Sequence, residues 1–173
     1  PDGATLAAGT GDGRVLRWPL TRTDGVPTVA DPRATVASPD PGTDDQPKPV
    51  ESMAWLPDSE TLLLTNRTSH VKTLLDARAG GDARRGPVQD TGPDALPLSL
   101  AVSPDGDRVA AGTTGRSVHR WELDGTDLTD ARPLPQLTGW NAYVNDVDYD
   151  EQGRLAAAGS DERLRVYDPA GTL

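Results

Sequence analysis

Three groups of residues have the composition and spacing of sites that carry out chemistry. The first is Gly9-x-Gly11-x-Gly13, which has the look of a glycine-rich loop that binds phosphate. Such a loop must lead into the N-terminus of a helix, because the helix amides donate hydrogen bonds to the phosphate. A strand-like run, Arg14 to Trp18, follows here instead. The glycines therefore predict a hairpin turn.

The second group is Asp146, Asp148 and Asp150, which are spaced like the first ligands of a calcium-binding loop. Such a loop needs glycine at its sixth position and glutamate at its twelfth, where this chain has Glu151 and Ala157. Alternation along a strand gives the same spacing, because every second side chain points to one face. We interpret the three carboxylates as one face of a strand.

The third group is the histidines. His70 and His119 have no second histidine at ligand spacing, and the chain contains no cysteine. No Gly-x-Ser-x-Gly sequence indicates a nucleophilic serine. We therefore expect packing or surface histidines, and neither a catalytic set, nor metal ligands, nor a cofactor.

Composition limits the fold and the partners. Short apolar runs separated by turns rich in the 18 glycines and 16 prolines predict an all-β chain. The formal net charge of −10 argues against nucleic acid as a partner, because phosphate binding needs clustered Lys and Arg. No window has the length of a membrane span or the pattern of a signal peptide, so we expect no membrane partner. The lack of cysteine fits a reducing compartment, and we expect a cytoplasmic protein.

The elements that must position any site come from an internal repeat. Similar stretches start at Pro1, Pro57, Pro104 and Glu151, and their bulky ends lie at Trp18, Thr73, Trp121 and Tyr167. Both sets of positions indicate a unit of about 45 residues, with an insertion in the first interval. A single domain results, with units at approximately 1–49 (partial), 50–96, 97–142 and 143–173 (partial).

Each unit is predicted to hold four short strands. The first strands are 50–56, 98–103 and 144–149, and the second are 4–8, 61–65, 108–111 and 154–158. The third strands are 14–18, 70–74, 117–121 and 163–167, and weaker fourth strands are 34–37, 87–89 and 133–137.

The order of these segments resembles the WD40 repeat, in which each four-stranded meander forms one blade of a β-propeller. Tyr167-Asp168 and Trp121-Glu122 lie where the family has Trp-Asp, and Trp18 keeps the aromatic residue. Asp12 and Asp161 lie at the family's turn aspartate, for which the other units have Arg67 and Gly115.

The chain departs from the family at the residues that form its buried polar network. The family's Gly-His pair is replaced by Gly139-Trp140 and Gly92-Pro93, and its second-strand serine by Ala8, Ala111 and Ala158. We therefore expect Asp12 and Asp161 to bond backbone amides in their own turns, and the blades to be joined mainly by packing.

The predicted strands amount to roughly three and a half blades, whereas propellers have about four to eight. The chain begins without methionine and within a turn, so we expect a fragment of a larger propeller. The alternatives are a small ring, or two copies that close one ring together.

The resemblance implies a non-catalytic platform that binds a protein or peptide through its loops. The possible partner-binding residues are Trp140, Tyr143, Arg67, Arg116 and Arg163, because exposed aromatic and arginine side chains often anchor interfaces. For Trp140 a second interpretation is open, in which it fills the space of the missing histidine.

The composition resembles that of actinobacterial proteins, so the resemblance further suggests a sensor or scaffold region of a larger bacterial signalling protein. One alternative is a propeller enzyme of the lactonase or hydrolase type, for which Asp148 offers a carboxylate while the matching positions are Ala54 and Ala101. Another is a purely structural segment for self-assembly.

Overall fold

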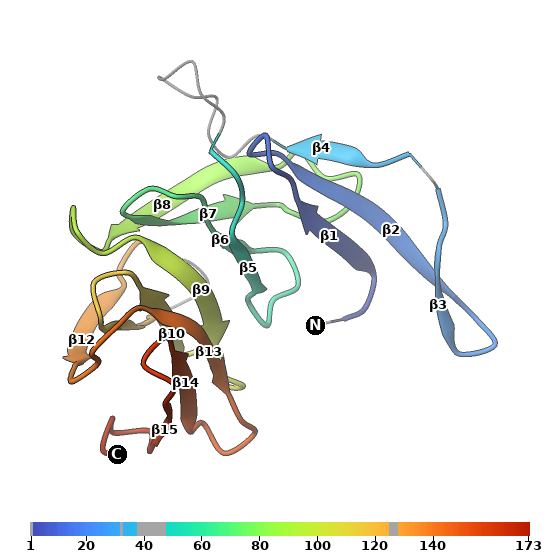
Figure 1. The fold of residues 1–173 in the computed structure, drawn as a ribbon. Coiled ribbons are helices and arrows are strands. Elements are labelled where there is room, and N and C mark those ends of the chain that lie inside the picture. Colours follow the sequence, from blue (N-terminus) through green and yellow to red (C-terminus); the bar gives the residue numbers. More distant parts are fainter. Residues whose placement is uncertain (1, 32, 38–47, 125–127) are drawn as a thin grey trace.

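The computed structural model describes residues 2–31, 33–37, 48–124 and 128–173, and every regular element among them is a β-strand. The strands form four antiparallel sheets that follow one another along the chain (Figure 1). No helix in these residues is available to cross a membrane. The predicted all-β fold is confirmed.

We call the four sheets blades 1 to 4. Blade 1 contains β1 (Thr5–Gly9), β2 (Val15–Thr23), β3 (Val26–Val29) and β4 (Thr35–Ala37). Blade 2 contains β5 (Ser52–Trp55), β6 (Leu62–Thr65), β7 (His70–Leu75) and β8 (Arg84–Asp90). Blade 3 contains β9 (Pro97–Val102), β10 (Arg108–Thr113), β11 (Val118–Glu122) and β12 (Arg132–Leu137). Blade 4 contains β13 (Val144–Tyr149), β14 (Leu155–Gly159) and β15 (Leu164–Tyr167).

Every predicted strand is present, and blades 2 and 3 are complete four-stranded meanders. In the described residues blade 1 has no strand inside β1, and blade 4 has none outside β15. The content is therefore the predicted three and a half blades. The first strands of neighbouring blades lie side by side, since β5 packs against β9 and β9 against β13. The blades thus radiate from their first strands, as in a propeller.

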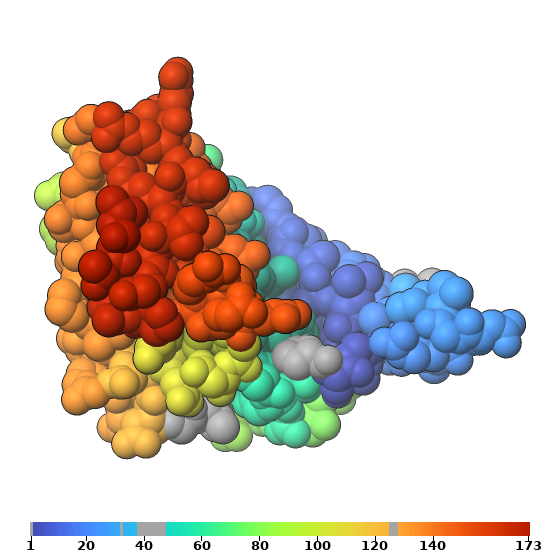
Figure 2. Space-filling model, turned by 90° about the horizontal axis from the view of Figure 1, so that it is seen from below, coloured from blue at the N-terminus to red at the C-terminus, as the bar shows by residue number. Residues whose placement is uncertain are grey.

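Strand β3 was not predicted. Strand β2 runs on past the edge of β4, and its residues Leu20–Thr23 pair with β3 to form a hairpin arm. The arm projects from the body in blue at the right of Figure 2. It accounts for part of the longer first interval of the repeat.

An aspartate closes the turn before the second strand of each blade. Its carboxylate accepts a hydrogen bond from the amide two residues ahead, at 2.9 to 3.2 Å, in the turns of Asp2, Asp58, Asp105 and Asp150. This local bond favours a tight turn over a continued strand. All four turns keep this aspartate, although only two of them have the sequence Pro-Asp-Gly.

Near the first strands, the blades are joined by serine hydroxyls. The Oγ of Ser52 on β5 accepts a hydrogen bond from the amide of Leu100 on β9, at 3.1 Å. The Oγ of Ser99, which has the same place on β9, accepts one from the amide of Val147 on β13, at 2.9 Å. Each inner strand therefore gives the next one a hydrogen-bond partner that its own sheet does not supply.

Glycine permits the close approach that these bonds require. A methyl group on Gly112, at the end of β10, would lie 2.8 Å from the carbonyl oxygen of Val144 in blade 4. Gly9 has the same place in blade 1 and faces Val50, which leads into blade 2. Any side chain at either glycine would push neighbouring blades apart.

Apolar side chains fill the space between successive sheets. On β6, Leu62 and Leu64 pack against blade 1, while Leu63 between them packs against blade 3. Because the second strands of blades 2 and 3 are buried on both faces, they read as continuous apolar runs. The aromatic residues near the ends of the third strands are also buried between blades: Trp121 between blades 2 and 3, and Tyr167 between blades 3 and 4.

The strand register corrects one marker of the repeat. Trp121 pairs with Val109 on the second strand of its blade, and the residue that pairs in this way with Leu62 in blade 2 is Leu74. Leu74, not Thr73, is therefore the bulky end of the third strand in blade 2.

Farther from the axis, a buried arginine clamps blade 1 to blade 2. Arg17 is 2% exposed, although it lies next to the half-buried Trp18. Its guanidinium donates to carbonyl oxygens in the loop after β7, at 2.9 to 3.3 Å, which belong to Asp76, Arg78 and Gly81. Burial lowers the pKa of Arg17, and the carbonyls accept hydrogen bonds from both of its Nη groups, while its buried Nε has no partner.

Arg120 has the equivalent place in blade 3 and is 5% exposed. Its Nη2 donates to the carbonyl of Pro135 at 3.0 Å, and the guanidinium lies against Gly171 in the turn after β15. Its hydrogen bond thus stays within blade 3, and its contact with Gly171 is a second contact between blades at this position.

Replacing Arg17 by methionine should lower the free energy of unfolding by about 2 kcal/mol, because three partly buried carbonyls lose their donor. Arg85→Met is the matched control: Arg85 is exposed on β8, and its loss should change stability by less than about 0.5 kcal/mol. Urea unfolding followed by circular dichroism measures both. Equal stabilities of the two variants would contradict the clamp.

Candidate functional site: the turn face

One end of the blades gathers the turns between second and third strands and the connections that lead into the first strands. Hydrogen bonds between backbone groups join turn and connection in blades 2, 3 and 4: Glu51 to Thr65, Thr114 to Leu96, and Ser160 to Tyr143, at 2.9 to 3.0 Å. We call this end of the molecule the turn face. Four of the five residues predicted to bind a partner are exposed there, and the fifth, Trp140, lies beneath it.

Tyr143 and two arginines are exposed on the turn face. Tyr143 is 54% exposed, and its carbonyl accepts the amide of Ser160, so it lies beside the turn that carries Arg163. Arg116 is exposed in the corresponding turn of blade 3, in the left-handed conformation with φ of 58°. These side chains stand on turns fixed by backbone bonds, an arrangement suited to binding.

Arg67 is also exposed, but it forms an ion pair with Glu51 at the start of blade 2. The pairing of Thr65 with Val71 matches that of Gly112 with Val118, so the residue equivalent to Gly115 is Thr68. Arg67 therefore does not occupy the turn-aspartate position assigned to it from the sequence.

Trp140 lies under the turn face, with only 4% of its surface exposed. The guanidinium carbon of Arg165 lies 3.8 Å from the centre of its ring, a cation–π contact. Arg165 also donates to Asp161 at 3.2 Å and to the carbonyl of Gly139 at 3.1 Å. The tryptophan packs between blades 3 and 4 and is not among the exposed side chains of the turn face.

Asp161 holds this cluster together. It accepts the amides of Arg163 in its own turn at 3.3 Å and of Asn141 at 3.4 Å, together with Arg165. Burial by itself would raise the pKa of Asp161, but the bonds from Arg165 and the amides lower it below the usual value. The carboxylate is thus charged at neutral pH and pairs with Arg165, whose side chain is 10% exposed.

Asp12 is exposed and bonds mainly to side chains, those of Thr10 and Arg14. These bonds, first that from Arg14 and then that from Thr10, lower the pKa of Asp12 to about 2. Asp168 accepts the amide of Thr172 at 2.8 Å and so fixes the turn after β15. Both aspartates shape turns.

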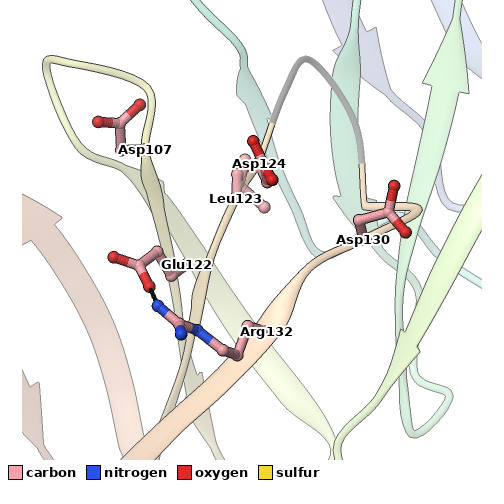
Figure 3. A pocket seen from close by; sticks show the side chains of 6 residues that line it. All are labelled: Asp107, Glu122, Leu123, Asp124, Asp130 and Arg132. Atoms are coloured by element: carbon pink, nitrogen blue, oxygen red, sulfur yellow. Dashed lines mark hydrogen bonds and ion pairs between the residues drawn. The ribbon is translucent and has the colours of Figure 1, made fainter.

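The opposite end of blade 3 carries an open pocket of about 520 Å³ that the sequence did not indicate (Figure 3). It is lined by Asp107, Glu122, Leu123, Asp124, Asp130 and Arg132. The Glu122 carboxylate is ion-paired with Arg132, which lowers its pKa. Among the described residues, no three His, Cys, Asp or Glu side chains come together in a way that could hold a metal ion.

The two histidines lie on third strands of blades 2 and 3. His119 is 9% exposed and packs near Trp121, with ring centres 6.0 Å apart. His70 is half-buried on β7, where it pairs with Asp90 of β8. Gly9 to Gly13 form the predicted hairpin turn between β1 and β2.

Replacing Trp140 by alanine should lower the free energy of unfolding by about 3 to 5 kcal/mol, because a large buried ring is lost and Arg165 is left without its stacking partner. Tyr143→Ala removes an exposed aromatic ring from the same connection and should cost less than about 0.5 kcal/mol. Thermal and urea unfolding compare the two. A larger loss for Tyr143→Ala would show that Trp140 is not a core residue.

Comparisons with known proteins were informative for one repeat and for the fold. The family described as "WD domain, G-beta repeat" matches residues 131–168, which contain β12 and all of blade 4. No curated protein matches the chain in sequence. A solved structure titled "Crystal Structure of Mitotic Checkpoint Complex" is similar over 96% of this chain, with a TM-score of 0.70 and 20% identity.

This chain spans about half of the chain it matches there, 48% of its length. At that identity the likeness concerns the fold, and the family match concerns the last repeat. Together the two findings support the WD40 family: residues 131–168 match its repeat, and the chain has the fold of a partial WD40 β-propeller.

Proposed function

We propose that the chain is a non-catalytic platform that binds a protein or peptide through its turn face. The observation that carries the proposal is Tyr143, an aromatic side chain that is 54% exposed on a turn fixed by backbone bonds, beside the exposed Arg163. Aromatic and arginine side chains are favoured anchors of protein interfaces. WD40 repeats are generally interaction platforms, and the similar solved structure is titled as a complex.

The proposed setting is a sensor or scaffold region of a larger bacterial signalling protein in the cytoplasm. The composition supports the bacterial origin, and the lack of cysteine supports the cytoplasm. The net charge of −10 favours a protein partner over nucleic acid. No observation supports the alternative of an enzyme with a site in the central channel.

The outer faces of the terminal blades support completion of the ring by further blades or by a second copy. Leu6 and Val36 are exposed on blade 1, and Leu164 and Val166 on blade 4. The corresponding faces of blades 2 and 3 are buried against a neighbour. Apolar sheet faces of this kind are normally covered.

Affinity capture from an extract of the source cells tests the platform. The double variant Tyr143→Ala/Arg163→Glu should lose at least about tenfold of the captured partner, because it removes the anchors and reverses one charge. Arg154→Glu is the matched control, since Arg154 is an exposed, ion-paired arginine at the opposite end of blade 4.

The control should retain the partner, because Arg154 lies away from the turn face. It should also stay folded, because a surface ion pair contributes less than about 1 kcal/mol to folding. The same proteins captured in equal amounts by all three forms would contradict binding through the turn face. Circular dichroism confirms that the variants are folded.

A further inference from the structure

The site that Trp140 fills in blade 4 recurs in blade 3 with smaller residues. Gly139-Trp140 leads into blade 4, and Gly92-Pro93 leads into blade 3, with φ of 89° and 88° at the two glycines. The strand registers make Gly115 equivalent to Asp161 and His119 equivalent to Arg165. Proline, glycine and histidine thus replace tryptophan, aspartate and arginine.

The smaller residues leave space. Two adjoining cavities, of about 220 and 300 Å³, open between blade 2 and blade 3. Both are lined by Thr91, Gly92, His119 and Gln136, and the smaller one also by Pro93 and Gly115. We call this space the slot. It lies on the turn face, because the turn and the connection that form it belong to that end of the blade.

The walls of the slot combine flat rings with carboxylates. His119 borders both cavities, and Trp121, near it, borders the larger one. Burial lowers the pKa of His119, with a smaller opposing effect from Asp90, so the imidazole is neutral at pH 7.5. The exposed Asp90 lines the larger cavity and the exposed Asp94 the smaller.

Arg120 is the one cationic side chain that borders the slot within the described residues. Its Nη2 donates to the carbonyl of Pro135, and its guanidinium lies against Gly171 in blade 4. The charge of Arg120 is therefore directed toward the contact between blades 3 and 4, away from the slot. Among the residues that line the slot, two carboxylates therefore face no cation directed into it, and the net charge of the whole chain is also negative.

We propose that the slot binds the guanidinium group of an arginine side chain that a protein partner presents to the turn face. Blade 4 shows that this architecture suits such a group, since Arg165 lies there on a ring, beside a carboxylate and the carbonyl of the glycine in the connection. Lysine lacks the planar surface that stacks on a ring. A neutral aromatic side chain would leave Asp90 and Asp94 unpaired. The inference rests on the proposed function and names one contact that the platform makes with its partner.

The test is a titration of the chain with acetyl-Gly-Arg-Gly-amide at pH 7.5, followed by NMR. The imidazole signals of His119 and the amide signals of Gly92 and Gly115 should shift and saturate, while those of Gly25 and Gly153 stay in place. The same peptide with lysine should bind at least about tenfold more weakly.

Two kinds of variant locate the binding. Pro93→Trp puts the tryptophan of blade 4 into the slot and should abolish the shifts by filling the space. Asp90→Asn/Asp94→Asn keeps the space, removes both charges and should weaken binding about tenfold or more. Asp130→Asn, an exposed aspartate at the opposite end of blade 3, should leave binding unchanged.

An arginine peptide that leaves His119 unshifted, or a lysine peptide that binds equally well, would overturn the proposal. So would undiminished binding to the doubly substituted variant. The platform is tested separately by capture through Tyr143 and Arg163. If the chain captures its partner but does not bind the arginine peptide, the proposed function stands and the proposal for the slot is overturned.

Discussion

The distance between neighbouring blades along their first strands is the constraint on which the molecule depends. The strand pairing stays within each sheet, so the blades are joined by side chains and by the few bonds that cross between sheets. Ser99 reaches the amide of Val147 only because Gly112 lets Val144 approach so closely. Small residues at the ends of second strands therefore determine the geometry of the ring, and with it the position of every turn on the turn face.

Away from the axis the blades diverge, and charged groups replace small ones. Arg17 bridges a gap that an aliphatic side chain could fill but could not bond across, because the opposite wall consists of backbone carbonyls. A buried guanidinium has a high desolvation cost, and several acceptors are needed to offset it. Arg165, stacked on Trp140, meets the same need with Asp161 and the carbonyl of Gly139. The contact between two neighbouring blades is thus apolar in the middle and polar at both ends. This arrangement fixes the angle between the blades as well as the distance.

The repeat predicted the strands well because burial on both faces leaves apolar runs that turns interrupt. Strand β3 escaped prediction because its residues are all exposed, so no burial pattern marks it. The second and third strands pair at the same separation in all four blades, but blade 2 keeps neither the aromatic residue nor the turn aspartate. Without these marker residues, Thr73 and Arg67 were placed one residue before Leu74 and Thr68, to which strand pairing gives those positions. The sequence could not decide whether Trp140 is buried, because its partner Arg165 is distant in the chain. The repeated Arg-Trp pair at Arg17-Trp18 and Arg120-Trp121 was a visible sign of the two buried arginines.

Repeats of one scaffold can separate stability from binding when equivalent positions diverge. In blade 4 the connection, the turn and the third strand supply Trp140, Asp161 and Arg165, and the joint is closed by its own side chains. In blade 3 the same three positions hold Pro93, Gly115 and His119, and the joint stays open while the core beneath it remains packed. Loss of the polar network there costs little, because Val109, Trp121 and their neighbours already hold the blades together. A joint that does not need its network for folding is free to accept those groups from another protein.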